Sequence, residues 1–351
     1  DCTSIFLYTQ DMPTLSKAKK ETQTILKLGG ILVLIIFLFL LGMRSLTFIK
    51  DLLTPQAPPQ ASFGRLFPIP FPNQQKENII YTLNTLSGFL PNFPDRAKVH
   101  KITADQPTLL GLPKTREKAG SVGFTSGETQ IAKDVYQWTD PNSSLQKRVT
   151  INIFSSDFTV SSSFLTRPSL QTLTNSRQKD NAVETAKSFL TDMSLFPQDI
   201  DENKTKTSLY SITQASLIPT VKISNAKIVR VDFFQKDVDN LPIYYEKGIT
   251  STISLLVGKE DRGLKVVNAT YFHKNISENS SAYAIKSASQ AFSQLKEGKG
   301  YVASKTAGIV EITIKKVFLG YYIGEGGQEF LMPVVVFEGD NDFVAYISAV
   351  R

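Results

Sequence analysis

Cysteine is nearly absent from this 351-residue chain, which has one cysteine, one tryptophan and two histidines. Because Cys2 has no partner, the sequence excludes a disulfide framework and thiol catalysis in the remainder of the chain. His100 and His273 lie outside any H-E-x-x-H pattern and far from the cysteine. We therefore interpret both histidines as ordinary surface or strand-end residues, and we expect no metal site and no cofactor.

Motifs of nucleophilic and phosphate chemistry are also lacking. No serine lies in a G-x-S-x-G elbow, although a Ser-His-Asp triad assembled by the fold stays open, because spacing does not reveal it. Residues 324–327 (GEGG) join two predicted strands and so indicate a hairpin loop instead of a phosphate loop. The acidic clusters at 237–240 and 340–342 lack the glycine and glutamate of a calcium loop. Turn formation is favoured there, and weak calcium binding is the alternative.

Charge of one sign is not concentrated anywhere in the chain. There are 39 lysines and arginines against 32 aspartates and glutamates, which gives a net charge of +7. Nucleic-acid-binding proteins gather basic residues on one face, whereas no run of basic residues here exceeds two. We expect no nucleic-acid partner. A solvated surface is favoured over a weak attraction to the anionic polymers of a cell envelope.

What the sequence does contain is one long apolar run at residues 25–43, which carries no charge from Leu28 to Met43. A bilayer core is about 30 Å thick and needs roughly 20 mostly apolar residues in a helix. Lys27 and Arg44 can extend the span because they reach towards the head groups. A buried core helix is the alternative, but apolar side chains surround every face of this helix. We predict a membrane anchor at residues 25–49. Its lipid-contacting residues are predicted to be Leu28, Ile31, Leu34, Phe37, Leu40 and Met43.

Basic residues around the run predict its orientation. Four lysines precede it within residues 17–27, and only Arg44 and Lys50 follow at a comparable distance. The more basic flank stays in the cytoplasm, so residues 1–24 are expected to form a cytoplasmic head of a single-pass cell-membrane protein. The C-terminal bulk is then extracytoplasmic. The run is longer than a signal-peptide core, which predicts an uncleaved signal anchor. We interpret residues 1–11, which precede the first methionine, as a translation artefact or a fragment edge.

Beyond the anchor, the sequence predicts a linker followed by three small repeated units. Residues 50–77 form the linker, whose six prolines favour an extended polyproline conformation, and we expect its apolar LFPIPFP part to dock on the folded part. Three units are predicted, at residues 78–168, 169–275 and 276–351, each with one amphipathic helix and several antiparallel strands. The helices are expected at 115–123, 181–193 and 281–297, and a β-bulge is expected where the alternation slips at Lys315-Lys316.

The last unit carries a resemblance to a known family. It contains AIKSASQAFSQLKEGKG, then VEITIKKVFLGYY, FLMPVVVFEG and FVAYISAV. This pattern resembles the PepSY-like family of bacterial envelope domains and the related YycH/YycI regulators, in which a helix packs across a small antiparallel sheet. The likeness covers residues 181–351. It implies an α+β fold in which tandem PepSY/YycI-like units follow the single transmembrane helix, and it implies a binding or regulatory module without catalysis.

Adjacent aromatic residues place one ring on each face of a strand. We favour packing between the repeated units for these rings, and a recognition surface is the alternative, because exposed aromatic residues mark interfaces. The candidate partner contacts are Phe234, Tyr245, Tyr321 and Tyr322.

The favoured functional hypothesis is an extracytoplasmic regulatory protein. It would act on an envelope or membrane protein by direct contact, with an extended partner segment added to an open sheet edge. A structural envelope scaffold is the alternative, an envelope hydrolase is the least favoured class, and self-association stays open.

Overall fold

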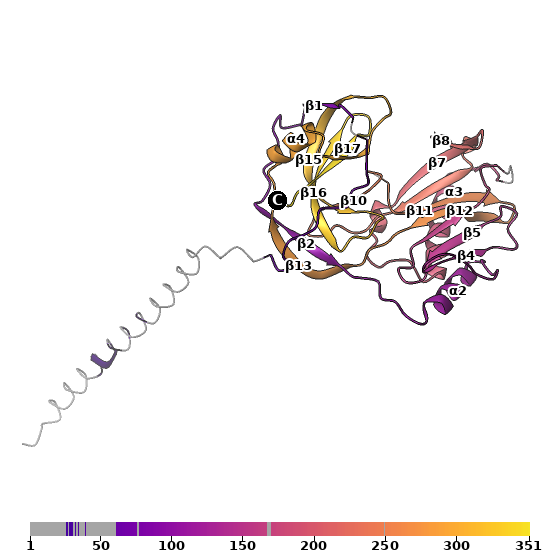
Figure 1. Cartoon of the computed structure of the whole chain (residues 1–351), viewed down its shortest axis with the longest axis horizontal. Helices are drawn as coiled ribbons and strands as arrows, with labels where there is room; N and C mark the ends of the chain where they lie inside the picture. Colours follow the sequence, from indigo (N-terminus) through magenta and orange to yellow (C-terminus); the bar gives the residue numbers. More distant parts are fainter. Residues whose placement is uncertain are drawn as a thin grey trace, which may run out of the picture. The chain divides into compact units, whose positions relative to one another are not determined.

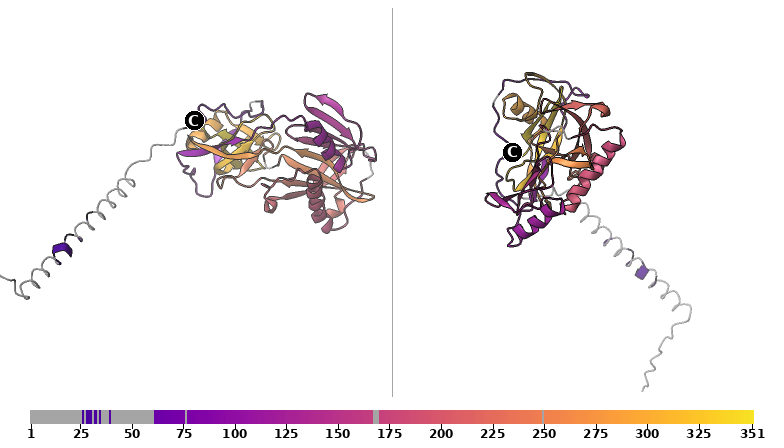
Figure 2. Two further views of the ribbon diagram at one scale, coloured as in Figure 1. Left: turned by 90° about the horizontal axis from the view of Figure 1, so that it is seen from below. Right: turned by 90° about the vertical axis from the view of Figure 1, so that its right-hand side faces the viewer.

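The computed structural model describes residues 26, 28–30, 32, 34, 39, 61–75, 77–166, 170–248 and 250–351. The chain divides into two compact units, Asp1–Pro59 and Gln60–Arg351. The second unit contains two β-sheets, which form two lobes side by side (Figure 1). Figure 2 shows the same two lobes from two further directions.

The unit Asp1–Pro59 includes the predicted membrane anchor. Leu28 and Leu34 are helical, whereas Ile31, Phe37, Leu40 and Met43 lie outside the described residues. Contrary to the predicted fold class, no helix formed by the described residues is long and apolar enough to cross a membrane.

The first lobe is built on a nine-stranded antiparallel sheet. Alternation along its strands divides the side chains between two faces. On one face Val229, Val231 and Leu255 join the largest hydrophobic core, and on the other Ile228 and Val267 join a smaller one. In spatial order the strands are β3 (Thr129–Ala132), β4 (Val135–Thr139), β5 (Arg148–Asn152), β6 (Phe158–Ser161), β12 (Gly263–Tyr271), β11 (Ile253–Glu260), β9 (Ile228–Phe233), β7 (Lys206–Thr213) and β8 (Ser216–Thr220).

Two helices belong to this lobe. Helix α3 (Arg177–Asp192) packs on β9, β11 and β12 through an apolar stripe, in which Ala186 and Leu190 are fully buried. The helix expected at 181–193 is thus confirmed, with a start four residues earlier than predicted. Helix α2 (Gly111–Ser121) corresponds to the helix expected at 115–123. The short 3-10 helices Glu202–Lys204 and Ile223–Asn225 flank β7 and β8.

The second lobe is built on an eight-stranded mixed sheet around the 13-residue strand β15 (Glu311–Ile323). β1 and β10 run parallel to β15 along one of its edges, and β16 runs antiparallel along the other. The register of β15 with β16 shifts between Ile314 and Lys316, which confirms the predicted bulge. The remaining strands are β1 (Ile80–Leu83), β2 (Arg96–Ile102), β10 (Ile243–Tyr245), β13 (Ile276–Ala284), β14 (Tyr301–Ser304), β16 (Phe330–Gly339) and β17 (Val344–Ser348).

Helix α4 (Ala288–Lys296) covers one face of this sheet, where Ala291 and Leu295 pack on the strands. A capping box between Ser287 and Gln290 starts the helix. The sequence predicted a start near residue 281, which is wrong, because residues 281–284 pair with β2 as the end of β13. Backbone pairing with a distant strand has overridden the local helical pattern.

Residues 61–75, here called the strap, cover the other face of the same sheet. Ile69 is buried there, and the Phe71 ring stacks on Tyr301 with a centroid distance of 5.2 Å. The Tyr283 hydroxyl donates to the Gly64 carbonyl at 3.0 Å. The predicted docking of the apolar LFPIPFP part is therefore confirmed.

The predicted fold class is wrong at the level of architecture. The protein is mostly β, with 40% strand and 17% helix, and it has two large sheets where tandem helix-plus-sheet units were expected. β1 and β2 join the sheet made mainly by residues 276–351, whereas β3 to β6 join the sheet of β7, β8, β9, β11 and β12. Alternation reveals that a segment is a strand but not which strand will pair with it.

The stacking of Phe71 predicts a measurable contribution of the strap to stability. We expect Phe71→Ala to lower the free energy of unfolding by about 1–3 kcal/mol, because the ring packs against three tyrosines. Phe67, from the same strap, is 80% exposed, so Phe67→Ala should change stability by less than about 0.5 kcal/mol. Urea unfolding of both variants measures the difference. Equal effects would show that the strap is not held through Phe71.

Candidate functional site

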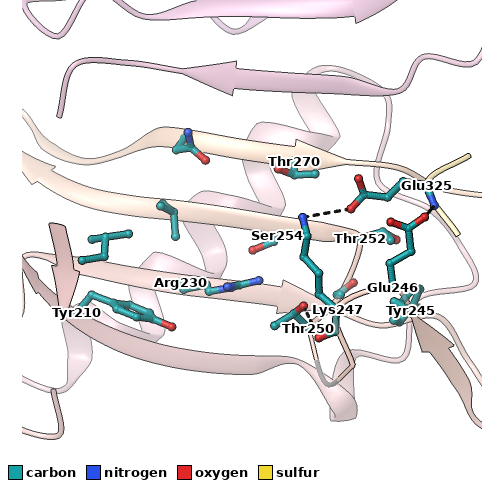
Figure 3. A pocket seen from close by; sticks show the side chains of 14 residues that line it. Tyr210, Arg230, Tyr245, Glu246, Lys247, Thr250, Thr252, Ser254, Thr270 and Glu325 are labelled. Carbon is teal, nitrogen blue, oxygen red and sulfur yellow. Dashed lines mark hydrogen bonds and ion pairs between the residues drawn. The ribbon is translucent and has the colours of Figure 1, made fainter. Parts of the chain in front are cut away.

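A polar cavity of about 330 Å³ lies where the two lobes meet. Strands β9, β11 and β12 of the nine-stranded sheet form its floor, and the β10–β11 and β15–β16 connections form its far end. In Figure 3, Tyr210 lies at one end of the view, Glu246 and Glu325 gather at the other, and Arg230 lies between them. We call it the junction cavity.

Arg230 is the fixed cation of the junction cavity. Val229 and Val231 point to the face that α3 covers, so strand alternation directs Arg230 to the opposite face. Its Nε donates to Asp232 Oδ1 at 3.0 Å, and within the described chain the guanidinium makes no other hydrogen bond. Asp232 is 5% exposed. Burial raises the pKa of the Asp232 carboxyl, and the charge of Arg230 opposes that rise.

The far end of the cavity carries two carboxylates and a lysine. Glu246 Oε1 accepts a hydrogen bond from the Glu325 backbone N–H at 2.7 Å, which ties the β15–β16 loop to the β10–β11 connection. Lys247 Nζ lies 3.5 Å from Glu325 Oε1. The Lys247 side chain is 73% exposed, so this ion pair contributes little to stability.

Buried tyrosines of the eight-stranded sheet position this far end. The Tyr346 hydroxyl donates to the Tyr245 carbonyl at 3.0 Å, and the Tyr301 hydroxyl donates to the Glu246 carbonyl at 2.9 Å. The backbone carbonyls of Tyr245 and Glu246 are therefore both fixed by hydrogen bonds from tyrosines of the eight-stranded sheet. Glu246 projects from a backbone segment that is fixed on both the sheet side and the loop side.

The cavity can recognise a polar molecule of mixed charge. Arg230 and Lys247 provide cations, Glu246 and Glu325 provide anions, and hydroxyl groups line the wall between them. Across the described residues there is no group of three or more His, Cys, Asp or Glu side chains that could hold a metal ion. The sequence analysis did not single out these residues. A usable signal existed, because Arg230 and Asp232 alternate with buried residues on one predicted strand.

The candidate contact aromatics are placed mainly in the interior. Tyr321 and Tyr322 are fully buried, and Tyr245 is 2% exposed at the cavity wall. Phe234 is half-buried, with Lys206 Nζ 5.2 Å from its ring centroid. The burial of these three tyrosines agrees with the favoured packing role and argues against the alternative of an exposed recognition surface, because neighbouring strands and side chains cover them.

His100 is buried and the His273 side chain is 8% exposed, so neither is an ordinary surface residue, although both lie near the end of a strand. His100 Nε2 lies 2.7 Å from Asp239 Oδ2, and His273 Nε2 lies 2.8 Å from Asp199 Oδ1. Burial alone would raise the carboxyl pKa of each aspartate. The hydrogen bond from His273 lowers the pKa of the Asp199 carboxyl, and hydrogen bonds from Lys98 and His100 lower the pKa of the Asp239 carboxyl. Both pKa values therefore lie below the usual range.

The sheet edges offer a second kind of site. All four residues of β3 are exposed, and among the described strands β3 pairs only with β4. The edge strand β8 contains Pro219, which lacks a backbone donor. At the edge strand β14, the Gln74 side chain bonds both the N–H and the carbonyl of Val302. β3 is therefore the edge of the nine-stranded sheet that lacks a proline, and its cover among the described residues is limited to the Gln130 side chain, which donates to the Ala132 carbonyl at 3.4 Å.

Comparisons with known proteins assign no family to this chain. No family model matches it, and no curated protein matches it. Among solved structures, it is similar to an uncharacterized protein from Eubacterium rectale ATCC 33656. The two share 13% sequence identity with a TM-score of 0.39, over 74% of this chain and 84% of that chain. A likeness this distant carries no functional argument.

The His100–Asp239 pair predicts a pH-dependent contribution to stability. We expect Asp239→Ala to lower the free energy of unfolding at neutral pH by about 1–3 kcal/mol, because the buried His100 loses its partner. The carboxyl pKa is lowered in the folded protein. The stabilisation is therefore present above about pH 4 and is lost as the pH falls through the lowered pKa.

Urea unfolding near neutral pH and near about pH 2 measures this dependence. The difference between wild type and Asp239→Ala should shrink at the lower pH. Asp105→Ala, at an exposed position, is the control and should differ little from wild type at either pH. A variant as stable as wild type at neutral pH would contradict the structural role of this pair.

Proposed function

We propose that this chain is a binding protein without catalytic activity, which acts on an envelope protein partner by direct contact. The observation that supports this most is the open edge of β3. A strand at a sheet edge presents unpaired backbone N–H and carbonyl groups. An extended segment of a partner can add to such an edge through main-chain hydrogen bonds, with side-chain pockets providing specificity.

The side chains around β3 favour this use of the edge. Ile131 is 54% exposed and gives an added strand an apolar side chain to pack against. Before the strand, Arg116 Nη2 lies 2.5 Å from Glu128 Oε1, which links the approach to β3 to helix α2. An exposed and partly apolar edge presents main-chain groups to an added strand.

Three parts of the proposal rest on the sequence. These are the likeness to PepSY-like and YycH/YycI proteins, the contact with a bilayer through residues 25–49, and the extracytoplasmic position of the C-terminal bulk. They stay predictions. The lack of catalytic activity belongs to the same proposal and follows from that likeness.

Site-specific photo-crosslinking tests the proposed edge. A photoreactive residue is placed at Ile131 in β3, and a matched one at Ile218 in the edge strand β8, which is 47% exposed. In native membranes, we expect the Ile131 probe to give one discrete adduct with an envelope protein, at several-fold higher yield than the Ile218 probe. Mass spectrometry identifies the adduct, and added purified partner should compete with it.

A second comparison separates the edge from the N-terminal unit. The full chain and a chain of residues 60–351, which form one compact unit, are crosslinked through Ile131. An adduct retained by the shorter chain supports recognition by the sheet edge. Adducts with only a second copy of the chain would favour the scaffold alternative. Equal adducts from Ile131 and Ile218 would contradict the β3 proposal.

A further inference from the structure

We propose that the junction cavity binds a short peptide with both termini free. Arg230 would hold the peptide carboxylate, and Glu246 and Glu325 would hold its ammonium group. This ligand is additional to the protein partner proposed at β3 and is independent of it. The proposal rests on the separation of opposite charges within one small cavity, and on the groups that line the path between them.

The carboxylate end is defined by the geometry of Arg230. Its guanidinium is held from behind through Nε by Asp232, and its side chain is 25% exposed, towards the cavity that it lines. The other guanidinium donors form a fork that matches the two oxygens of a carboxylate. Because Asp232 and the strand fix the fork, little side-chain entropy is lost when an anion binds.

An apolar surface adjoins this end. Leu256 is the direct cross-strand neighbour of Arg230, and Tyr210 and Leu217 line the cavity with it. A carboxylate on Arg230 would place the C-terminal side chain of a peptide against these three residues. The structure therefore predicts a preference for an apolar C-terminal residue.

The ammonium end is defined by Glu246 and Glu325, which Figure 3 shows across the cavity from Arg230. One oxygen of Glu246 accepts the Glu325 backbone N–H, so the carboxylate is oriented before any ligand arrives. The contact of Lys247 with Glu325 is long at 3.5 Å and exposed. A ligand ammonium can replace that contact at small energetic cost.

Hydroxyl and amide groups lie between the two ends and suit the peptide bond of a ligand. They can donate to a carbonyl and accept from an N–H. The volume of about 330 Å³ is at the small end for ligand sites, which limits the occupant to a short peptide. These groups belong to Thr250, Thr252, Ser254, Asn268 and Thr270.

Calorimetry with capped and uncapped dipeptides tests the proposal on the full chain. The probes are Ala-Leu, its N-acetyl form, its C-terminal amide, and free leucine, whose two charges sit on one carbon. We expect Ala-Leu to bind, and each cap to weaken binding by about tenfold or more, because each removes one charge-assisted contact. Leucine should bind more weakly than Ala-Leu, since one carbon cannot present its charges to both ends.

Variants assign each ligand charge to its residue through a double-mutant cycle. In Arg230→Gln, which removes the cation, the amide cap should no longer weaken binding. In Arg230→Lys, which keeps the charge beside Asp232 but loses the fork, the amide cap should weaken binding less than in wild type. In Glu325→Gln, the acetyl cap should lose its effect instead. Arg148→Gln, on an exposed position of β5, is the matched control and should bind like wild type. Near-UV circular dichroism verifies that each variant is folded.

Several results would overturn the proposal. Failure of folded wild-type protein to bind Ala-Leu at about 1 mM, the weak end of specific affinity, would do so. So would equal binding of capped and uncapped probes, or an amide-cap effect that persists undiminished in Arg230→Gln. Loss of the β3 crosslink would leave this ligand proposal unaffected, because the two readouts use different residues.

Discussion

The hydroxyl groups of buried tyrosines usually find hydrogen-bond partners, and two such contacts organise the centre of the molecule, although the buried Tyr322 hydroxyl has no partner among the described residues. Tyr301 and Tyr346 lie side by side on the eight-stranded sheet, with ring centroids 6.1 Å apart. Their hydroxyls donate to the carbonyls of residues 246 and 245, outside their own strands. The aromatic cluster that receives the strap therefore also fixes the wall of the junction cavity.

The contacts that join distant parts of the chain concentrate near the same region. Asp239, in the β9–β10 connection, holds His100 of β2, and Tyr321 also donates to it at 3.2 Å. Gln235, just after β9, donates to Asp199 at 2.7 Å, and Asp199 holds His273. Both histidines of the chain thus serve in buried hydrogen-bond networks. Such networks are favourable only when nearly every polar group has a hydrogen-bond partner. Because Gln235 and Asp239 both lie in the connection between β9 and β10, these hydrogen bonds fix its conformation.

The proposed functions use two different properties of this framework. The edge of β3 offers main-chain groups on the lobe of the nine-stranded sheet, where specificity comes from one exposed isoleucine and its surroundings. The junction cavity offers opposite charges held on separate elements, Arg230 on a strand and Glu325 on a loop. A ligand that contacts both ends would link the two lobes.

Much of the local structure was determined by the sequence itself. The amphipathic pattern of residues 181–193 predicted helix α3. The break in apolar alternation at Lys315-Lys316 predicted the β-bulge, and the apolar LFPIPFP part of the linker predicted a docked segment. These features depend on side chains close together in the chain, whose periodicity is visible without a fold.

Only the tertiary structure decided how the strands combine and where the site lies. Residues 281–284 carry a helical pattern but pair with β2, and the first predicted unit divides its strands between two sheets. Strand pairing depends on which partner buries each face, which is a property of the whole chain. The same holds for the cavity, because Arg230, Glu246 and Glu325 meet only through the packing of two sheets. Charges brought together from separate strands and loops leave no spacing pattern that a sequence can show.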